Sequence, residues 1–218
     1  MSREKLLCPS MMCADFGALA EETKVLDAAG ADIFHCDIMD GQFVPNMAMG
    51  PSDVKAVRAA TKKLVDAHLM IENPAGKVDW FIDAGADIIY IHPESERYTG
   101  KTLVHIRERG AKAGIAINPD TSLATVSELI PLCDYIMVMT VHPGFAGQKF
   151  VETTKEKIKV LAAMKEQYGF RLMIDGACSP VVIAEQSAAG VDGFVLGTSA
   201  LFGKGRPFAE IMPELRAL

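Results

Sequence analysis

A histidine and an aspartate stand two residues apart in a short apolar run, and together they could carry metal or proton chemistry. The segment 33–46 begins as a strand and ends in a loop punctuated by Gly and Pro. Because successive strand side chains alternate between faces, His35, Asp37 and Met39 are expected on one face. A buried imidazole and carboxylate are costly unless something pairs with them. They could bind a metal ion together or form a mutual hydrogen bond, and this stretch alone leaves both interpretations open.

Further polar side chains stand at or near the ends of other apolar runs. A lone histidine in a strand, such as His68, is more often a satisfied core residue, but a second histidine at the level of His35 favours a site. Asp175, followed by a Gly turn, is a second candidate for a buried carboxylate. Ser10 could contact a ligand, and His92 is expected to form hydrogen bonds at the rim.

Small residues at three loops are suited to holding an anion. Residues 144–147 bring free backbone N–H groups next to the start of a helix, a weak pattern by itself because many Pro-Gly turns bind nothing. Loops after the seventh and eighth strands of a barrel often form a phosphate-binding cup. The small residues expected at that cup are Gly176, Ala177, Gly197 and Thr198.

Four methionines, Met12, Met39, Met70 and Met139, fall at or just after the ends of expected strands. Methionine is a flexible side chain that fills gaps in a core, so the clustering could be accidental. The functional alternative is a soft lid that keeps water away from a reactive intermediate. The sequence does not decide between the two interpretations.

These residues need elements to position them, and the hydrophobic pattern indicates eight strand–helix units. Strands are expected at 6–9, 33–38, 64–69, 88–91, 114–118, 135–139, 171–174 and 193–196, and helices at 16–29, 52–61, 75–84, 101–109, 123–130, 152–168, 180–189 and 208–218. Three similar segments, at 29–32, 84–87 and 189–192, place a Gly between a helix and a strand, as expected of a left-handed helix end. Eight such units predict a (β/α)8 barrel. An open doubly wound sheet is the alternative, but the Gly-x-Gly-x-x-Gly motif that it would favour is absent after the first strand.

Composition restricts the classes of partner and compartment. The chain has 218 residues, half of them hydrophobic, and no low-complexity linker, so one domain over 1–218 is expected. The net charge is -6 and no basic cluster stands out, which argues against nucleic-acid and membrane partners. Five scattered cysteines and no signal-peptide core after residues 1–5 favour a reducing cytoplasm.

With these motifs in hand, the chain resembles the ribulose-phosphate 3-epimerase family over nearly its whole length. The segments that carry the resemblance are 9–10, 35–46, 68–70, 118–119, 138–150, 175–176 and 197–202, and the block His-x-Asp-x-Met-Asp-Gly-x-Phe-Val-Pro-Asn at 35–46 is its most specific part. The resemblance implies a (β/α)8 epimerase that inverts C3 of a phosphorylated ketose, and it suggests a homo-oligomer. Two rival interpretations are weaker. A metal-dependent sugar-phosphate decarboxylase on a similar barrel would show an Asp-x-Lys arrangement at a strand end, and no expected strand here ends in lysine. A non-catalytic sensor of sugar phosphates would need the phosphate-binding cup but not four metal ligands.

The resemblance also implies roles for single residues. One divalent metal would be held by His35, Asp37, His68 and Asp175, with Asp37 and Asp175 as the two acid/base groups. Ser10 and His68 would contact the sugar. The phosphate would be held by Gly144, Phe145, Ala146, Gly147, Gly176, Ala177, Gly197 and Thr198, and Met39, Met70 and Met139 would form the lid. Two histidines with two carboxylates favour zinc or iron(II), with manganese and cobalt as alternatives.

The residues near the site leave the length of the sugar open. Met11, Met12 and Cys13, the segment 143–148 and the segment 197–199 look closer to the allulose-6-phosphate 3-epimerase branch of the family. The segment 49–51 looks like the pentulose branch, and His142 matches neither. The sequence therefore leans slightly to D-allulose 6-phosphate over D-ribulose 5-phosphate.

Overall fold

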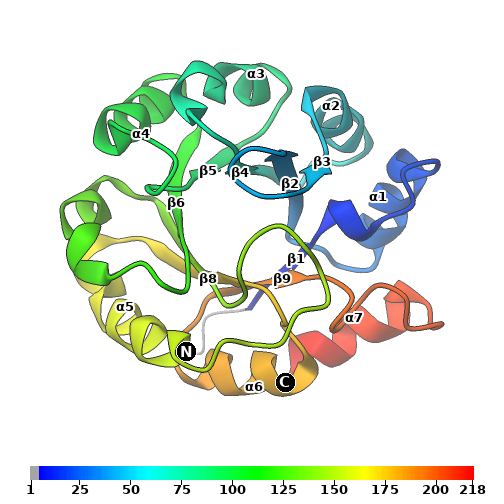
Figure 1. Ribbon diagram of the computed structural model, residues 1–218. Coiled ribbons are helices and arrows are strands. Elements are labelled where there is room, and N and C mark those ends of the chain that lie inside the picture. Colours follow the sequence, from blue (N-terminus) through cyan, green and yellow to red (C-terminus); the bar gives the residue numbers. More distant parts are fainter. Residues whose placement is uncertain (1–4) are drawn as a thin grey trace.

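The structure is a computed structural model that describes residues 5–218, and within them eight parallel strands form a barrel (Figure 1). The strands are β1 (Leu6–Pro9), β2 (Ile33–Asp40), β4 (Leu64–Met70), β5 (Ile88–Ile91), β6 (Lys112–Ile117), β7 (Tyr135–Met139), β8 (Arg171–Asp175) and β9 (Gly193–Leu196). Neighbours pair in chain order, β1 also pairs with β9, and a bridge between Ser10 and His35 joins β1 to β2. A short antiparallel strand, β3 (Met47–Ala48), is added to the end of β2. The predicted (β/α)8 barrel is confirmed.

Helices surround the strands in Figure 1. They are α1 (Leu19–Ala28), α2 (Pro51–Ala60), α3 (Val78–Asp83), α4 (Thr99–Glu108), α5 (Thr154–Tyr168), α6 (Pro180–Ala188) and α7 (Phe208–Ala217), with the short 3-10 helices η1 (Met11–Cys13) and η2 (Pro74–Gly76). The predicted helix at 75–84 is thus divided, because the backbone of Lys77 leaves the helical conformation between η2 and α3.

The expected α-helix at 123–130 is wrong in type. The segment forms two 3-10 helices, η3 (Leu123–Thr125) and η4 (Ser127–Leu132). The hydroxyl groups of Thr125 and Ser127 donate hydrogen bonds to carbonyls three residues back, at 2.7 Å and 3.2 Å. Pro131 has no N–H to donate. Side-chain competition and a missing donor therefore favour the tighter, shorter helices.

Each strand divides its side chains between two cores. Phe34, Cys36 and Ile38 of β2 pack between the strands and the helices, whereas Ile33 of the same strand packs inside the barrel. Inside the barrel Tyr90 lies across Gly114, where a Cβ atom would come within 2.5 Å of its ring. His35, Asp37 and Met39 alternate with the outward residues, so the predicted shared face is confirmed.

Aspartates clamp the N-terminal ends of the strands. Asp32, Asp87, Asp134 and Asp192 each accept a hydrogen bond from a backbone N–H in the preceding parallel strand, on Leu7, Val65, Ala113 and Leu172 respectively, at 2.8–3.0 Å. Three of them follow the predicted Gly turns, and Gly30, Gly85 and Gly190 indeed have φ values of 98°, 101° and 100°. The repeated Gly turn therefore places an aspartate where its side chain links two neighbouring strands at the N-terminal end of the barrel, the end at which stability is concentrated.

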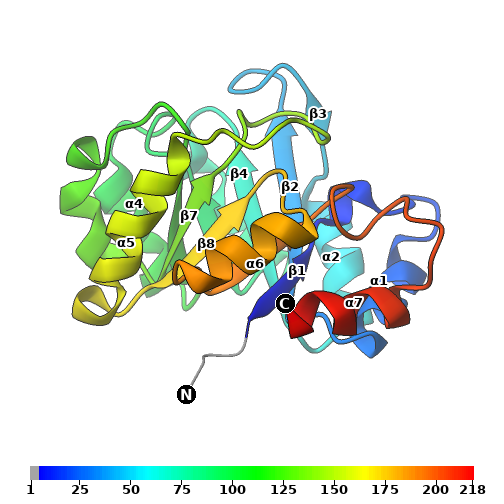
Figure 2. The same cartoon turned by 90° about the horizontal axis from the view of Figure 1, so that it is seen from below.

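The loops that could carry function lie at the other end of the barrel. Figure 2 shows the β2–β3 loop and the loop before α5 rising at the upper side, away from α7 and the start of β1. The charged start of the chain, considered above for a signal peptide, falls on residues 1–4, which lie outside the described part. Among residues 5–218 none of the helices combines the length and apolar character that a membrane crossing requires.

Candidate active site

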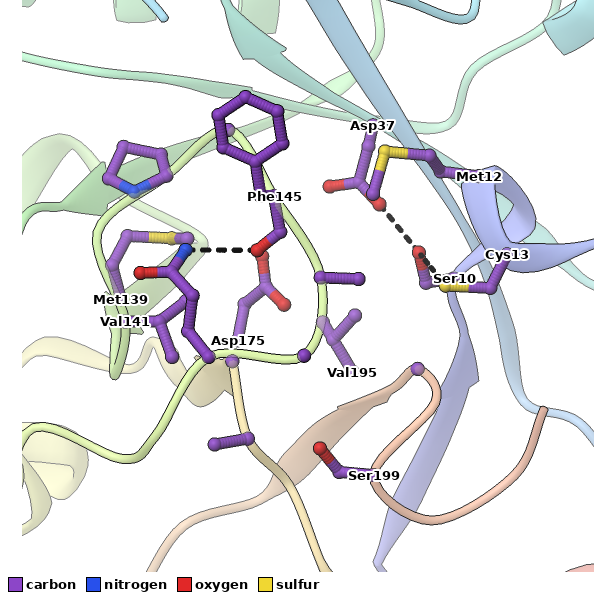
Figure 3. A pocket seen from close by; sticks show the side chains of 18 of the residues that line it. Ser10, Met12, Cys13, Asp37, Met139, Val141, Phe145, Asp175, Val195 and Ser199 are labelled. Atoms are coloured by element: carbon purple, nitrogen blue, oxygen red, sulfur yellow. Dashed lines mark hydrogen bonds between the residues drawn. The ribbon is translucent and has the colours of Figure 1, made fainter. Parts of the chain in front are cut away.

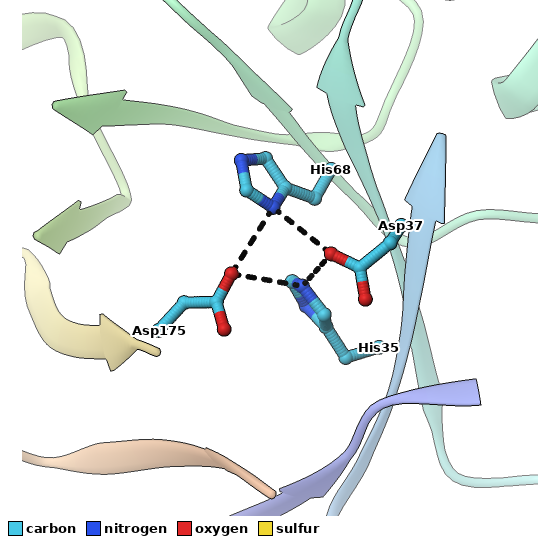
Figure 4. Close-up of side chains that lie close together, drawn as sticks. All are labelled: His35, Asp37, His68 and Asp175. Carbon is cyan, nitrogen blue, oxygen red and sulfur yellow. Dashed lines mark hydrogen bonds and ion pairs between the residues drawn. The ribbon is translucent and has the colours of Figure 1, made fainter. Parts of the chain in front are cut away.

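Four side chains from three strands meet near the C-terminal ends of the strands (Figure 4). His35 and Asp37 come from β2, His68 from β4 and Asp175 from β8. One donor atom from each lies within 4.8 Å of all the others. The Nε2 atom of His35 is 3.2 Å from Asp37 Oδ1 and 3.9 Å from Asp175 Oδ2, and the Nδ1 atom of His68 is 3.4 Å and 3.6 Å from the same two oxygens. The sequence-predicted metal ligands therefore converge.

Burial makes this cluster strongly coupled. The side chains of His35 and His68 are fully buried, Asp37 is 6% exposed and Asp175 is 15% exposed. Burial would raise the pKa of Asp37, but His35 and His68 outweigh it and hold that pKa below its usual value. Burial and the negative charge of Asp37 raise the pKa of Asp175 to about 6. The two carboxylates thus have unlike environments, a common property of acid/base pairs.

The donor set fits a divalent cation. Ligands at about 2.1 Å from a tetrahedral zinc ion stand roughly 3.4 Å apart, and the four distances between imidazole and carboxylate atoms lie around this value. The Nδ1 atom of His68 is buried and has no hydrogen-bond donor or acceptor partner among the described residues, although it faces both carboxylates. An unpartnered nitrogen beside two carboxylates is what a cation would satisfy.

The second nitrogen of each imidazole also has a neighbour. His35 Nδ1 lies 2.7 Å from Oδ1 of Asp66, a fully buried residue of β4. His68 Nε2 lies 2.8 Å from His92 Nε2, and His92 too is fully buried. Burial lowers the pKa of His92 to about 4, so its imidazole is neutral at neutral pH. Outer partners of this kind orient metal-binding imidazoles.

A pocket opens above the cluster and encloses about 540 Å³ of space, part of it open to solvent (Figure 3). Its lining residues are Ser10, Met12, Cys13, Asp37, Met39, Met70, Met139, Val141, 143–148, 175–178, Val195, Gly197 and Ser199. Asp37 and Asp175 reach it from different sides (Figure 3), whereas His35 and His68 are not among its lining residues.

One end of the pocket is built from glycine-rich turns. Gly176 has φ 112°, and a Cβ atom there would come within 2.5 Å of the Val141 side chain. Its neighbour Ala177 also has a positive φ, 51°, which is rare for a residue other than glycine. Among the described residues that line the pocket none is lysine or arginine. An anion bound here would therefore rely on backbone N–H groups.

Hydrogen bonds hold the loop between β7 and α5 over this end. Asn46 Nδ2 donates to the carbonyl oxygen of Gly144 at 2.7 Å, and Gln148 Nε2 donates to the carbonyl oxygens of His142 and Phe145 at 2.6 Å and 2.9 Å. Thr140, fully buried, donates from N and Oγ1 to the carbonyl oxygen of Asp175 at 2.7 Å and 3.0 Å. The loop and the carboxylate of Asp175 are thus positioned together.

The pocket gathers most of the remaining predicted residues. Ser10 Oγ donates to Asp37 Oδ2 at 2.6 Å. Met39, Met70 and Met139 all line the pocket, and Met12 joins them. Phe145, which is 52% exposed, lies on the loop that crosses the pocket.

Thr198 and His92 lie elsewhere than the patterns suggested, because His92, expected at the rim, is fully buried. The side chain of Thr198 is exposed and outside the pocket lining, where Ser199 stands instead, so a phosphate contact by Thr198 remains a prediction. His142 is 58% exposed at the rim, with Nδ1 3.8 Å from Asp120 Oδ2.

Neither Asp66 nor Glu94 was singled out from the sequence. Asp66 stands two residues before His68, and Glu94 two residues after His92. That spacing places each pair on one face and was the signal available. The spacing does not tell which imidazole each carboxylate contacts. Asp66, for example, contacts His35 of another strand and not His68 of its own.

Comparison with known proteins agrees with this geometry. The model of the ribulose-phosphate 3 epimerase family matches residues 6–202. Ribulose-phosphate 3-epimerase of Synechocystis sp. is 43% identical over 99% of this chain and 95% of its own length. The Escherichia coli K12 protein of the same name is 38% identical over 99% and 96%. A ribulose-5-phosphate-3-epimerase described as chloroplastic, from Arabidopsis thaliana, is 38% identical over 97% and 76%.

Solved structures with the same fold are more distant in sequence. A mutant tryptophan synthase alpha-subunit of Pyrococcus furiosus superimposes with a TM-score of 0.71 at 13% identity, covering 99% of this chain and 98% of its own. A 3-hexulose-6-phosphate synthase gives a TM-score of 0.67 at 20% identity, covering 98% of both chains. At these identities the likeness supports the barrel alone.

Proposed function

Because the chain belongs to the ribulose-phosphate 3-epimerase family, we propose that it is a metal-dependent isomerase that inverts C3 of a phosphorylated ketose. The observation that carries the proposal is that two carboxylates, Asp37 and Asp175, belong to one cluster of donor atoms and both line the same open pocket. A protein that only sensed sugar phosphates would need the pocket but not four convergent metal ligands.

The two carboxylates could exchange a proton with opposite faces of C3. The proton at C3 is acidified by the neighbouring C2 carbonyl, and its removal leaves an enediolate. Asp37 and Asp175 reach the pocket from strands that β9 and β1 separate. One carboxylate takes the proton from its side and the other returns a proton from its own, and the roles exchange in the reverse direction. The hydrogen bond from Ser10 holds Asp37 at a fixed orientation for this transfer.

A divalent cation would be held by His35, Asp37, His68 and Asp175. When bound, it would supply positive charge that stabilises the enediolate. The ligand types favour zinc or iron(II), with manganese and cobalt as alternatives. Reversible loss of activity on treatment with a chelator would support this part of the proposal.

The phosphate group would lie at the glycine-rich end. Residues 144–147 and the turns at Gly176 and Gly197 offer backbone N–H groups there, and small side chains leave space for the anion. Anchoring the remote end of the sugar would orient C3 between Asp37 and Asp175.

The relatives' names support D-ribulose 5-phosphate as the substrate and D-xylulose 5-phosphate as the product. D-allulose 6-phosphate, with D-fructose 6-phosphate as product, is a second candidate. It is favoured by the branch-like segments around Met12, at 143–148 and at 197–199, all of which contribute residues to the pocket. A side-by-side measurement of kcat/KM on the two phosphorylated ketoses decides between them. Lack of turnover of both by the metal-loaded protein would overturn the proposal.

Three further properties belong to the same proposal. We propose that 1–218 is a single domain, that the protein acts in the cytoplasm and that it forms a homo-oligomer, as the family resemblance suggests. Light scattering on the purified chain tests the last point. A molar mass of one chain would contradict it.

A further inference from the structure

The nitrogen of His68 that faces away from the metal cluster makes an unusual contact. Its Nδ1 atom faces Asp37 and Asp175, so ligation of a metal requires a lone pair at Nδ1 and a proton at Nε2. That Nε2 atom lies 2.8 Å from Nε2 of His92. Two imidazole nitrogens at this distance can share only one proton, so His92 Nε2 must accept it.

His92 is held firmly in this position. It is fully buried, its ring lies edge to edge with that of His68, with centroids 5.0 Å apart and planes inclined by 24°, and the ring centroid of Phe43 lies 4.8 Å from its own. Its carbonyl oxygen accepts hydrogen bonds from N and Oγ of Ser95 at 3.0 Å and 3.2 Å. A neutral imidazole that accepts at Nε2 must carry its proton at Nδ1.

The Nδ1 atom of His92 faces a carboxylate. Glu94 Oε2 lies 3.5 Å from it, and a carboxylate oxygen can only accept. The other oxygen, Oε1, accepts from the backbone N–H of Asn118 at 2.9 Å and from the Thr121 hydroxyl. Both oxygens of Glu94 therefore face donors, and its orientation is fixed from two sides.

We infer that Glu94 and His92 form a relay of positioning residues that fixes the tautomer of His68 and so presents its Nδ1 lone pair to the metal. His68 Nε2–H then donates to His92 Nε2, and His92 Nδ1–H is directed at Glu94 Oε2, an electrostatic contact at 3.5 Å and not a hydrogen bond. The inference rests on the metal site of the proposed function and extends that site outward through His92 to Glu94. For His35 no intermediate histidine is needed, because its Nδ1 atom contacts the carboxylate of Asp66 directly.

The isosteric variant Glu94→Gln tests the relay. A glutamine has one oxygen, so when that oxygen accepts from Asn118 and Thr121, its NH2 group faces His92 Nδ1. This favours a lone pair at His92 Nδ1 and a proton at His92 Nε2. That proton would point at the proton on His68 Nε2, so the His68 tautomer needed for metal binding would be destabilised. We expect the affinity of the metal-free chain for Zn²⁺, measured by competition with a chromogenic chelator, to fall by about 10- to 100-fold, as is usual for outer partners.

Glu96→Gln is the matched control. Glu96 lies in the same loop region and, like Glu94, accepts two hydrogen bonds, here from the backbone N–H groups of Ala75 at 2.9 Å and Tyr98 at 3.0 Å. Neither donor is a histidine. The Zn²⁺ affinity of this variant should stay within twofold of the parent. Equal affinities of the two variants would overturn the inference, whereas failure of the parent chain to bind Zn²⁺ would overturn the proposed function instead.

Long-range ¹H–¹⁵N spectra of the histidine rings read the tautomers directly. In the Zn²⁺-loaded parent, His68 should carry its proton at Nε2 and His92 at Nδ1. In metal-free His92→Gln the amide oxygen can still accept from His68, so the His68 tautomer should be kept, whereas His92→Leu should lose it. Spectra with His92 protonated at Nε2, or an unchanged His68 tautomer in folded His92→Leu, would overturn the relay.

Discussion

Aspartate side chains lie at both ends of the barrel and meet different partners. At the N-terminal end Asp192 accepts from the backbone N–H of Leu172 at 2.8 Å and pairs with Lys165 at 2.8 Å. At the C-terminal end the neighbours of Asp175 are the carboxylate of Asp37 and the imidazoles of His35 and His68. Within residues 5–218, no lysine or arginine nitrogen forms an ion pair with Asp37 or Asp175 at 4.0 Å or less.

The difference teaches how one residue type serves two purposes in one fold. A carboxylate with a backbone donor and a basic partner is satisfied, and it stabilises the junction between strands. Two carboxylates held close together repel each other, so binding a cation or a proton between them is favourable. The barrel therefore concentrates stability at one end and chemistry at the other.

The largest effect is expected from Asp175→Asn. An amide cannot take or return the proton at C3, so kcat should fall by about 10³- to 10⁴-fold, in the upper range for general acid–base groups. Because the variant relieves repulsion with Asp37, the melting temperature of the metal-free chain should stay equal or rise. Near-normal turnover of the phosphorylated ketose would contradict the two-carboxylate assignment.

Asp192→Ala should show the opposite pattern. Its side chain is 2% exposed and Lys165 is 12% exposed, so the variant leaves a buried charge without its partner. The free energy of unfolding should fall by about 3–5 kcal/mol, while kcat per folded molecule stays within about twofold of the parent, the scatter expected away from the site. Urea denaturation and active-site titration measure the two quantities. A large loss of kcat in the folded fraction would contradict the conclusion that the N-terminal end serves stability and the C-terminal end serves catalysis.

His68→Ala sharpens the comparison at the C-terminal end. The variant removes a direct ligand, so the affinity for Zn²⁺ should fall by at least about 100-fold, the upper limit for outer partners. Metal analysis after dialysis against a fixed Zn²⁺ concentration measures the loss. Unchanged metal content would remove His68 from the ligand set.

Ser10→Ala should have a smaller effect. Loss of the hydrogen bond to Asp37 Oδ2 is expected to cost about 1.5 kcal/mol, or roughly tenfold in kcat/KM. Ser179→Ala is a useful comparison, since Ser179 accepts from Val182 N at the start of α6. It should lower stability by about 1 kcal/mol with little change in kcat. Equal kcat/KM for the parent and Ser10→Ala would show that Asp37 is oriented without Ser10.

The sequence by itself determined the repeating units and the types of residue at the strand ends. Continuous apolar runs specify strands covered on both faces, and the Gly turns mark where helices end. Alternation alone placed His35 and Asp37 on one face of their strand, because neighbouring side chains of a strand must face opposite ways. These are local properties, which the order of residues carries directly.

Only the tertiary structure decided which of these residues meet. His35, His68 and Asp175 are joined by the closure of the barrel and its register, neither of which a short stretch of sequence encodes. The same closure pairs Asp66 with His35 instead of with its own neighbour His68, and it brings His92 Nε2 to within 2.8 Å of His68 Nε2. The 3-10 helices at 123–132 likewise reflect competing hydrogen bonds that periodicity does not weigh. Contacts between distant segments depend on the packing of the whole chain, so the geometry of the site follows from the fold.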